Sequence, residues 1–318
     1  MTLSARSRRA TAASAAGLAL VLSGCGAGAS DDGSVSLGFV NGGDTEFHTC
    51  LQASVEDTAE AEDAELYTAN SHQNPGTELS NIEDMISRDV DALIVQTVNV
   101  DALKGDIAKA KSANIPIFLT SVVTDDPTDI LGAVVVDLKQ VGELDAGWVG
   151  KDAAGKPAEA GVIAGAPGAA SDLLVNGFTK ALPDNVEVVA NQPGMFNAAK
   201  AQDVAENMIQ AHPDLAYAFV ANEEMAFGAL KAFQAAEADV KIVTVNGTDR
   251  GVAAVKDGRF AATVANSAMT TGRIALTNTL ALLDKKKTDK IASTPISLIT
   301  ADNVSSAPQY CSAEEKKS

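Results

Sequence analysis

Polar side chains follow several short β-rich runs of this 318-residue chain, at the points where strands would end. They are Asp44, Gln96, Ser121, Asn222, Asn246 and Asn266. Amides and hydroxyls break no covalent bond unaided, but they direct hydrogen bonds to the polar groups of a bound molecule. Their recurrence predicts a ligand pocket, although the ordinary polarity of loops would explain any single position.

Sequence motifs for catalysis and for metal binding are missing. The histidines His48, His72 and His212 stand apart, without an HExxH motif or a paired Cys/His spacing. The sequence also has no GxSxG motif, no Walker-type loop and no GxGxxG that opens a helix. We therefore expect no enzyme, no metal and no cofactor. A secreted hydrolase remains an alternative, which turnover of candidate substrates would reveal.

Alternating strands and amphipathic helices must position these polar residues. We predict strands at 35–40, 64–69, 92–95, 115–119, 161–164, 186–189, 216–220, 240–245, 260–264 and 296–299. We predict helices at 47–61, 78–88, 100–113, 172–182, 198–211, 225–236, 251–256 and 270–283. This alternation indicates βαβ units with parallel sheets, in which ligands bind at the carboxyl ends of strands. Two series of similar size favour an α/β fold of two doubly wound, Rossmann-like lobes, and a closed (β/α)₈ barrel is the alternative.

The composition narrows the possible partners. With 24 Lys and Arg against 42 Asp and Glu, the formal net charge is −18, which argues against binding of nucleic acid. A hydrophobic content of 46% fits a globular protein, and aromatic residues make up only 4%. A small molecule is therefore a better candidate partner than a protein that needs an aromatic-rich surface.

The first residues have the pattern of an export signal. Arginines precede an uncharged, largely apolar run at 10–22, which is too short to span a bilayer. Leu22-Ser23-Gly24-Cys25 resembles the lipobox of bacterial lipoproteins, in which cleavage leaves the lipid-bearing cysteine first. We therefore predict a signal peptide at 1–24 and a lipid such as palmitate on Cys25. Arg8-Arg9 leaves twin-arginine export open beside the general route.

Residues 25–34 after the signal are small and polar, which is typical of a flexible tether. A lipid before it and a globular body after it would hold the protein at the outer face of the bacterial cell membrane. The sequence shows no later apolar segment long enough to span the bilayer. We therefore expect the lipid anchor to be the only contact with the membrane.

From about Val35 to Ile299 the chain resembles the type I periplasmic sugar-binding proteins of ABC importers, the ribose- and galactose-binding group. The stretches that carry the resemblance are Gln73-Asn74-Pro75, 91–95, 113–117, 211–230, 245–248 and 257–264. The resemblance implies two lobes joined by three chain crossings, near Asp137, near Asn266 and at 295–299. Lobe one would comprise 35–137 plus 267–294, and lobe two 138–266 plus 295–318.

The same resemblance implies a function. A monomer would capture a sugar or polyol as the lobes close and deliver it to ABC permease subunits. A sensory receptor that signals to a chemotaxis or kinase partner is the alternative, and a neighbouring transporter operon would tell the two apart.

The resemblance also implies ligand-binding roles for particular residues. Phe47 and Phe196 fall where relatives stack aromatic rings on a sugar, although a role in the core would also explain them. Four residues fall at hydrogen-bonding positions: Asp44, Asn222, Asn246 and Asn266.

Two arginine positions of the family are altered. Ser121-Val122 stands where relatives have Asp-Arg, and Leu174 stands where they have Arg. Because arginine grips hydroxyls through charge-assisted bonds, its loss leaves a smaller or less polar ligand open.

Cys50 and Cys311 remain once Cys25 carries lipid. An exported protein meets conditions that permit disulfides, so we predict that these two pair and fasten the C-terminal tail to the first helix. Two buried free thiols are the alternative.

Overall fold

Strands and helices alternate along the chain as the hydrophobic pattern predicts, and the α/β fold of two lobes is confirmed. The computed structural model describes residues 34–100 and 103–311. The predicted signal peptide, Cys25 and the tether as far as residue 33 lie outside the described residues. Because the strands form two separate sheets, the alternative of one closed barrel is wrong. We call the part around the first sheet lobe one and the part around the second lobe two.

Lobe one is built on a parallel sheet with the strand order β11-β5-β4-β3-β1-β2. Its strands are β1 (Ser36–Asn41), β2 (Glu65–Asn70), β3 (Ala92–Val95), β4 (Ile117–Ser121), β5 (Gly132–Val135) and β11 (Ile291–Ser293). Four helices cover it: α1 (Glu46–Ala61), α2 (Pro75–Ser87), α3 (Leu103–Ser112) and α9 (Ala268–Leu283). The short 3-10 helix η1 (Pro127–Asp129) precedes β5.

Alternate residues of β1 explain how this sheet is covered on both faces. Leu37 and Phe39 join the core cluster that contains residues of α1 and α9. Val40 joins the opposite cluster, with residues of α2 and α3. Successive side chains of a strand point to opposite faces, so a run of apolar residues is needed where both faces are buried.

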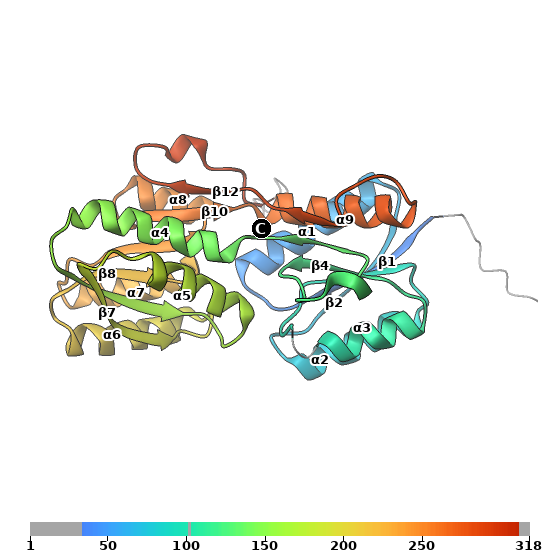
Figure 1. Ribbon diagram of the computed structural model, residues 1–318, viewed down its shortest axis with the longest axis horizontal. Coiled ribbons are helices and arrows are strands. Elements are labelled where there is room, and N and C mark those ends of the chain that lie inside the picture. The colour runs from blue at the N-terminus through green and yellow to red at the C-terminus, as the bar shows by residue number, and fades with distance from the viewer. Residues whose placement is uncertain (1–33, 101–102, 312–318) are drawn as a thin grey trace, which may run out of the picture. The chain divides into compact units, whose positions relative to one another are not determined.

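Lobe two is built on a sheet with the strand order β12-β10-β9-β8-β6-β7. Its strands are β6 (Ala158–Ala164), β7 (Val186–Pro193), β8 (Leu215–Val220), β9 (Lys241–Asn246), β10 (Ala262–Asn266) and β12 (Ile296–Ile299). Its helices are α4 (Leu138–Ala153), α5 (Ala169–Ala181), α6 (Ala198–Ala211), α7 (Glu223–Ala235) and α8 (Asp249–Lys256), and the 3-10 helix η2 (Val304–Ser306) follows β12. Helix α4 lies beside α5, and α6 beside α7 (Figure 1).

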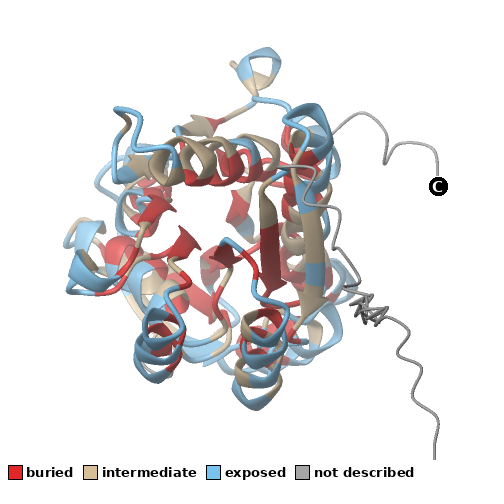
Figure 2. Cartoon of the chain, turned by 90° about the vertical axis from the view of Figure 1, so that its right-hand side faces the viewer, coloured by how far each residue is buried: buried red, intermediate tan, exposed pale blue. Residues whose placement is uncertain are grey.

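Core and surface are separated as this arrangement requires. Figure 2 shows the strands largely buried and the outward faces of the helices exposed. Among the described residues, no helix combines the length and apolar character needed to cross a membrane.

The chain passes between the lobes more than once. It leaves β5 of lobe one for α4 and β6 of lobe two, and it returns from β10 to α9 and β11. It passes again from β11 to β12, and the last described residues end against α1 and α9 of lobe one. We propose boundaries of 35–137 plus 267–294 for lobe one and 138–266 plus 295–318 for lobe two, because sheet membership changes near these points.

The structure differs from the predicted elements in a few places. Strands β5 and β11 and helix α4 were not among the predicted ranges, and β12 runs antiparallel to β10. Helix α2 begins at Pro75 instead of Glu78. The Asn74 side chain caps it by accepting hydrogen bonds from the Gly76 and Thr77 backbone N–H groups, at 2.8 and 3.0 Å. A cap fixes where a helix starts independently of its apolar periodicity.

Candidate functional site

A cavity of about 450 Å³ lies at the carboxyl ends of strands from both sheets. Lobe one supplies Gly42 after β1, the loop at 96–100 after β3, and Ser121 and Val122 at the end of β4. Lobe two supplies residues that follow or end β8, β9 and β10. This is where ligands bind in open α/β sheets.

The structure places all the predicted binding residues except Asp44 at this cavity. Those that line it are Phe47, Gln96, Ser121, Phe196, Asn222, Asn246 and Asn266. Asp44 is exposed, and its carboxylate contacts His72 Nδ1 at 2.8 Å and Asn70 Nδ2 at 2.9 Å. The loop between β1 and α1 reaches the cavity through Gly42 and Thr45 instead. We therefore do not retain Asp44 as a ligand-binding candidate.

Four buried polar atoms at the cavity make no well-formed hydrogen bond within the described part of the chain. They are Gln96 Oε1, Ser121 Oγ, Asn266 Oδ1 and Tyr310 Oη. Buried polar groups are paired in most proteins, because an unpaired one loses its hydrogen bonds to water without replacement. Their gathering at one cavity indicates that hydroxyl or similar groups of a ligand complete these bonds.

Asn222 also has a structural role. Its side-chain oxygen accepts a hydrogen bond from the Met225 backbone N–H at 2.8 Å and so caps α7. Its amide NH₂ group and the second lone pair of its oxygen are left to bind a ligand.

As elsewhere in the described chain, backbone in the left-handed region occurs at the cavity. Ser121, Met195, Phe196 and Asn246 line it with positive φ angles of 68°, 59°, 52° and 134°. Residues with side chains adopt this region at a cost, and such residues cluster at ligand-binding sites.

Two buried carboxylates hold the loops of the cavity, one in each lobe. Glu78 accepts hydrogen bonds from Thr97 Oγ1 at 2.7 Å and from the Val98 backbone N–H at 2.6 Å. Glu223 accepts from the backbone N–H groups of Gly247 and Thr248, both at 2.9 Å. Neither carboxylate was predicted from the sequence as a site residue, although Glu223 directly follows the candidate Asn222.

Burial also changes the ionisation of these carboxylates. It raises the pKa of Glu78, against the hydrogen bonds from Val98 and Thr97. It raises the pKa of Glu223 to about 7, against hydrogen bonds from Thr248, Thr263 and Gly247.

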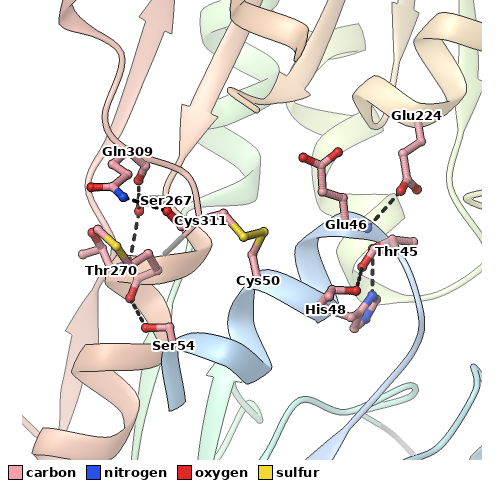
Figure 3. The surroundings of a disulfide bond; sticks show 12 residues. Thr45, Glu46, His48, Cys50, Ser54, Glu224, Ser267, Thr270, Gln309 and Cys311 are labelled. Carbon is pink, nitrogen blue, oxygen red and sulfur yellow. Dashed lines mark hydrogen bonds between the residues drawn. A yellow bond between two sulfur atoms is a disulfide. The ribbon is translucent and has the colours of Figure 1, made fainter. Parts of the chain in front are cut away.

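Lysine and arginine side chains are missing from the described walls of the cavity. Among its described lining residues, none is lysine or arginine, and Val122 and Leu174 occupy the two altered arginine positions. Burial lowers the pKa of His48 to about 4, although the Gln96 side chain and the Asp44 charge oppose the shift. His48 is therefore neutral at pH 7, and its Nδ1 lies 2.7 Å from Thr45 Oγ1 (Figure 3). This environment disfavours an anionic ligand.

One hydrogen bond joins the lobes at the edge of the cavity. The Glu46 backbone N–H at the start of α1 donates to Glu224 Oε1 in the first turn of α7, at 2.9 Å (Figure 3). This bond links the first helix of lobe one directly to lobe two.

Both predicted aromatic residues line the cavity, and both also pack on the core. The ring of Phe196 lies against Gly165, where an added Cβ would come within 2.1 Å of Phe196 Cζ. Phe47 meets the His48 ring edge to face, with centroids 5.7 Å apart. The two interpretations of these residues, ligand contact and core, therefore do not exclude each other.

The predicted disulfide between Cys50 and Cys311 is present (Figure 3). Tyr310, the residue before Cys311, lines the cavity and was not predicted as a site residue from the sequence. The only sequence signal for this residue is its position beside Cys311.

No group of three or more His, Cys, Asp or Glu side chains within residues 34–100 and 103–311 could hold a metal ion.

Comparison with known proteins agrees with this geometry. The family described as periplasmic binding protein domain matches residues 37–287. The ribose import binding protein of Bacillus subtilis strain 168 is 28% identical over 255 residues, covering 80% of this chain and 83% of the relative. The xylitol-binding protein of Mycolicibacterium smegmatis is 28% identical over 318 residues, covering 96% and 88%.

A solved structure shares the fold. The periplasmic binding component of the arabinose ABC transporter from Shewanella sp. ANA-3, bound to arabinofuranose, superposes with a TM-score of 0.80 at 26% identity. The match covers 85% of this chain and 93% of that one.

Proposed function

The chain belongs to the periplasmic binding protein family, and from this premise we propose that it is the substrate-binding component of an ABC importer. It captures a neutral sugar or polyol in the cavity between its lobes. It binds this solute without transforming it, and it releases the solute to membrane permease subunits.

The observation that carries this proposal is the set of unpartnered polar atoms at the cavity, Gln96 Oε1, Ser121 Oγ, Asn266 Oδ1 and Tyr310 Oη. They come from both lobes and from the C-terminal segment. A molecule with several hydroxyls can bond to all of them at once, and contacts to both lobes favour the closed state. The rings of Phe47 and Phe196 can cover the C–H surface of such a molecule.

The side chains of the cavity wall narrow the range of possible ligands further. Val122 and Leu174 are apolar and cannot make the charge-assisted hydrogen bonds that arginine would make. The ligand is therefore held by neutral hydrogen bonds and apolar contacts. A pentose, a furanose sugar or a small polyol suits this wall better than a sugar acid. Relatives that bind ribose, xylitol and arabinofuranose lend support to this range.

We also propose that the protein works as a monomer held by a lipid on Cys25 at the outer face of the cell membrane. The basic, apolar and small-residue segments at 1–25 support the lipid anchor. Globomycin, which blocks the lipoprotein signal peptidase, should cause a larger precursor to accumulate. Unchanged processing would contradict the lipid anchor.

A thermal-shift screen tests the ligand class. D-ribose, L-arabinose, xylitol, myo-inositol and D-galactose are compared with D-glucuronate at equal concentration. A ligand at 100 times its Kd stabilises the folded state by about 2.7 kcal/mol, which corresponds to a rise of several degrees in Tm. We expect at least one neutral compound to give such a rise and glucuronate to give none. If every neutral sugar and polyol leaves Tm unchanged, the proposed ligand class is wrong.

A further inference from the structure

The last described residues form a segment that is fastened to lobe one. We call Gln309–Cys311 the C-terminal strap. Cys311 is joined to Cys50 of α1 by the disulfide. The Met269 backbone N–H donates to the Tyr310 carbonyl at 3.0 Å, and Ser267 Oγ donates to the Gln309 carbonyl at 2.6 Å. The strap therefore lies against the starts of both α1 and α9 (Figure 3).

Tyr310 lies in the middle of this strap and lines the cavity. Its side chain is only 2% exposed, and its hydroxyl makes no well-formed hydrogen bond among the described residues, although the Asn246 side chain lies close enough to oppose the rise in the phenol pKa. Burial, with the negative charges of Glu223, Glu46 and Glu224, raises the pKa of the phenol. The hydroxyl therefore stays protonated at neutral pH and can donate a hydrogen bond as well as accept one.

The position of Tyr310 differs in kind from that of the other cavity residues. Asn246 and Asn266 end strands of a sheet, so the fold of a lobe alone sets their place. Tyr310 lies beyond β12 and η2, on a strap that comes from lobe two and is fastened to lobe one. The disulfide is the covalent part of that attachment, at the residue next to Tyr310.

We propose that Tyr310 is a ligand-binding residue and that the Cys50–Cys311 disulfide is what positions its hydroxyl at the cavity. This inference rests on the proposed function. Tyr310 also packs against Cys50 and Ala268, so a pure packing role is the rival explanation. Phenylalanine would keep the packing and remove only the hydroxyl, which separates the two explanations.

Calorimetric titration with D-ribose, L-arabinose, xylitol and myo-inositol tests the role of the hydroxyl. For each compound that binds the wild type, Tyr310→Phe should weaken binding about tenfold, the effect of one lost hydrogen bond. The matched control is Tyr67→Phe, since Tyr67 Oη bonds to Glu65 on the exposed side of β2. That control should bind within about twofold of the wild type. Wild-type affinity in Tyr310→Phe would overturn the proposal.

A double-mutant cycle tests the role of the disulfide. Replacing both cysteines, Cys50→Ser with Cys311→Ser, should weaken binding by about tenfold or more, with circular dichroism showing a folded protein. Adding Tyr310→Phe to that variant should then cost less than about twofold, because the hydroxyl is no longer held in place. A loss that stays tenfold in the absence of the disulfide would show that the disulfide does not position Tyr310.

The positioning role of the disulfide can be tested without ligand, and adding ligand afterwards tests the proposed function separately. In protein labelled with 3-fluorotyrosine, dithiothreitol supplies the two electrons and two protons that convert the disulfide into two thiols. The fluorine signal of Tyr310 should shift on reduction, whereas those of Tyr67 and Tyr217 should not. An unmoved Tyr310 signal overturns the positioning role. If the four compounds leave both Tm and all three signals unchanged, the proposed function fails instead, and the ligand-binding role of Tyr310 fails with it.

Discussion

At the scale of single residues, the polar groups at the strand ends divide into those that serve the fold and those left for a ligand. Asn222 Oδ1 is used to cap α7, and Glu223 is used to hold the next loop. Asn266 Oδ1 and Ser121 Oγ have no partner within the described residues. The sequence makes these residues look alike, and only their contacts distinguish them.

This difference predicts that two asparagine variants differ in their effect on stability. Asn266→Ala should weaken binding of a sugar or polyol about tenfold and change the free energy of unfolding by less than about 0.5 kcal/mol. Asn222→Ala should also lower stability by about 1 kcal/mol, because it removes the cap of α7. Urea denaturation and calorimetric titration of both variants check this. Equal losses of stability would contradict the assignment.

Asp145 in α4 predicts a pH dependence of stability. It is fully buried, neither carboxylate oxygen has a partner among the described residues, and burial with the Glu223 charge raises its pKa. The folded state then holds a proton that the unfolded state loses near pH 3.8. Stability from this site is therefore fully present below that pH and is lost as pH rises through the folded-state pKa. Glu223, with a pKa of about 7, acts in the same direction between about pH 4.5 and 7.

Asp145→Asn cannot ionise, so it should stabilise the protein at pH 8 by roughly 1–3 kcal/mol and much less at pH 4. Thermal denaturation of both proteins across this range measures the difference. Because the Glu223 charge helps to raise the pKa of Asp145, part of this difference reports the interaction between the two carboxyl groups. A difference that is the same at pH 4 and pH 8 would show that Asp145 is ionised in the fold throughout.

At the scale of elements, the hydrophobic pattern was enough to predict most strands and helices. It failed for a short element such as β11, with three residues, for the 16-residue helix α4, and for the start of α2, which a cap fixes. Proximity to the cavity was predictable where a residue ends a strand, as for Asn246 and Asn266. Asp44 could not be placed from spacing, because the side-chain direction in a loop depends on its contacts. Tyr310 could not be found, because a disulfide across 261 residues of sequence brings it to the cavity.

The contact between the end of β6 and the Phe196 ring predicts a sensitive glycine. Gly165→Ala should push this ring from its place, because the new Cβ would overlap Cζ, and should weaken ligand binding about tenfold. Gly147→Ala in α4 is the matched control, since an added Cβ there meets nothing within 4 Å. That variant should bind normally and gain up to about 1 kcal/mol of stability. Normal binding by Gly165→Ala would remove Phe196 from the site.

At the scale of the whole molecule, the proposed function requires a cavity that both lobes form. Each lobe contributes unpartnered polar atoms, an aromatic ring and a carboxylate that holds the neighbouring loop. The bond between Glu46 and Glu224 and the strap at Tyr310 connect the lobes on either side of this site. A ligand that bonds to both lobes at once would favour the closed arrangement through those contacts.

The absence of lysine and arginine from the described cavity wall makes the charge of the ligand the most direct test. Isothermal titration calorimetry should compare neutral pentoses and polyols with D-glucuronate. We predict one-to-one binding of at least one neutral compound, and no measurable binding of glucuronate. Tight binding of glucuronate would contradict the central claim that this chain captures an uncharged sugar or polyol between its lobes. A failure of every neutral compound to bind would contradict it as well.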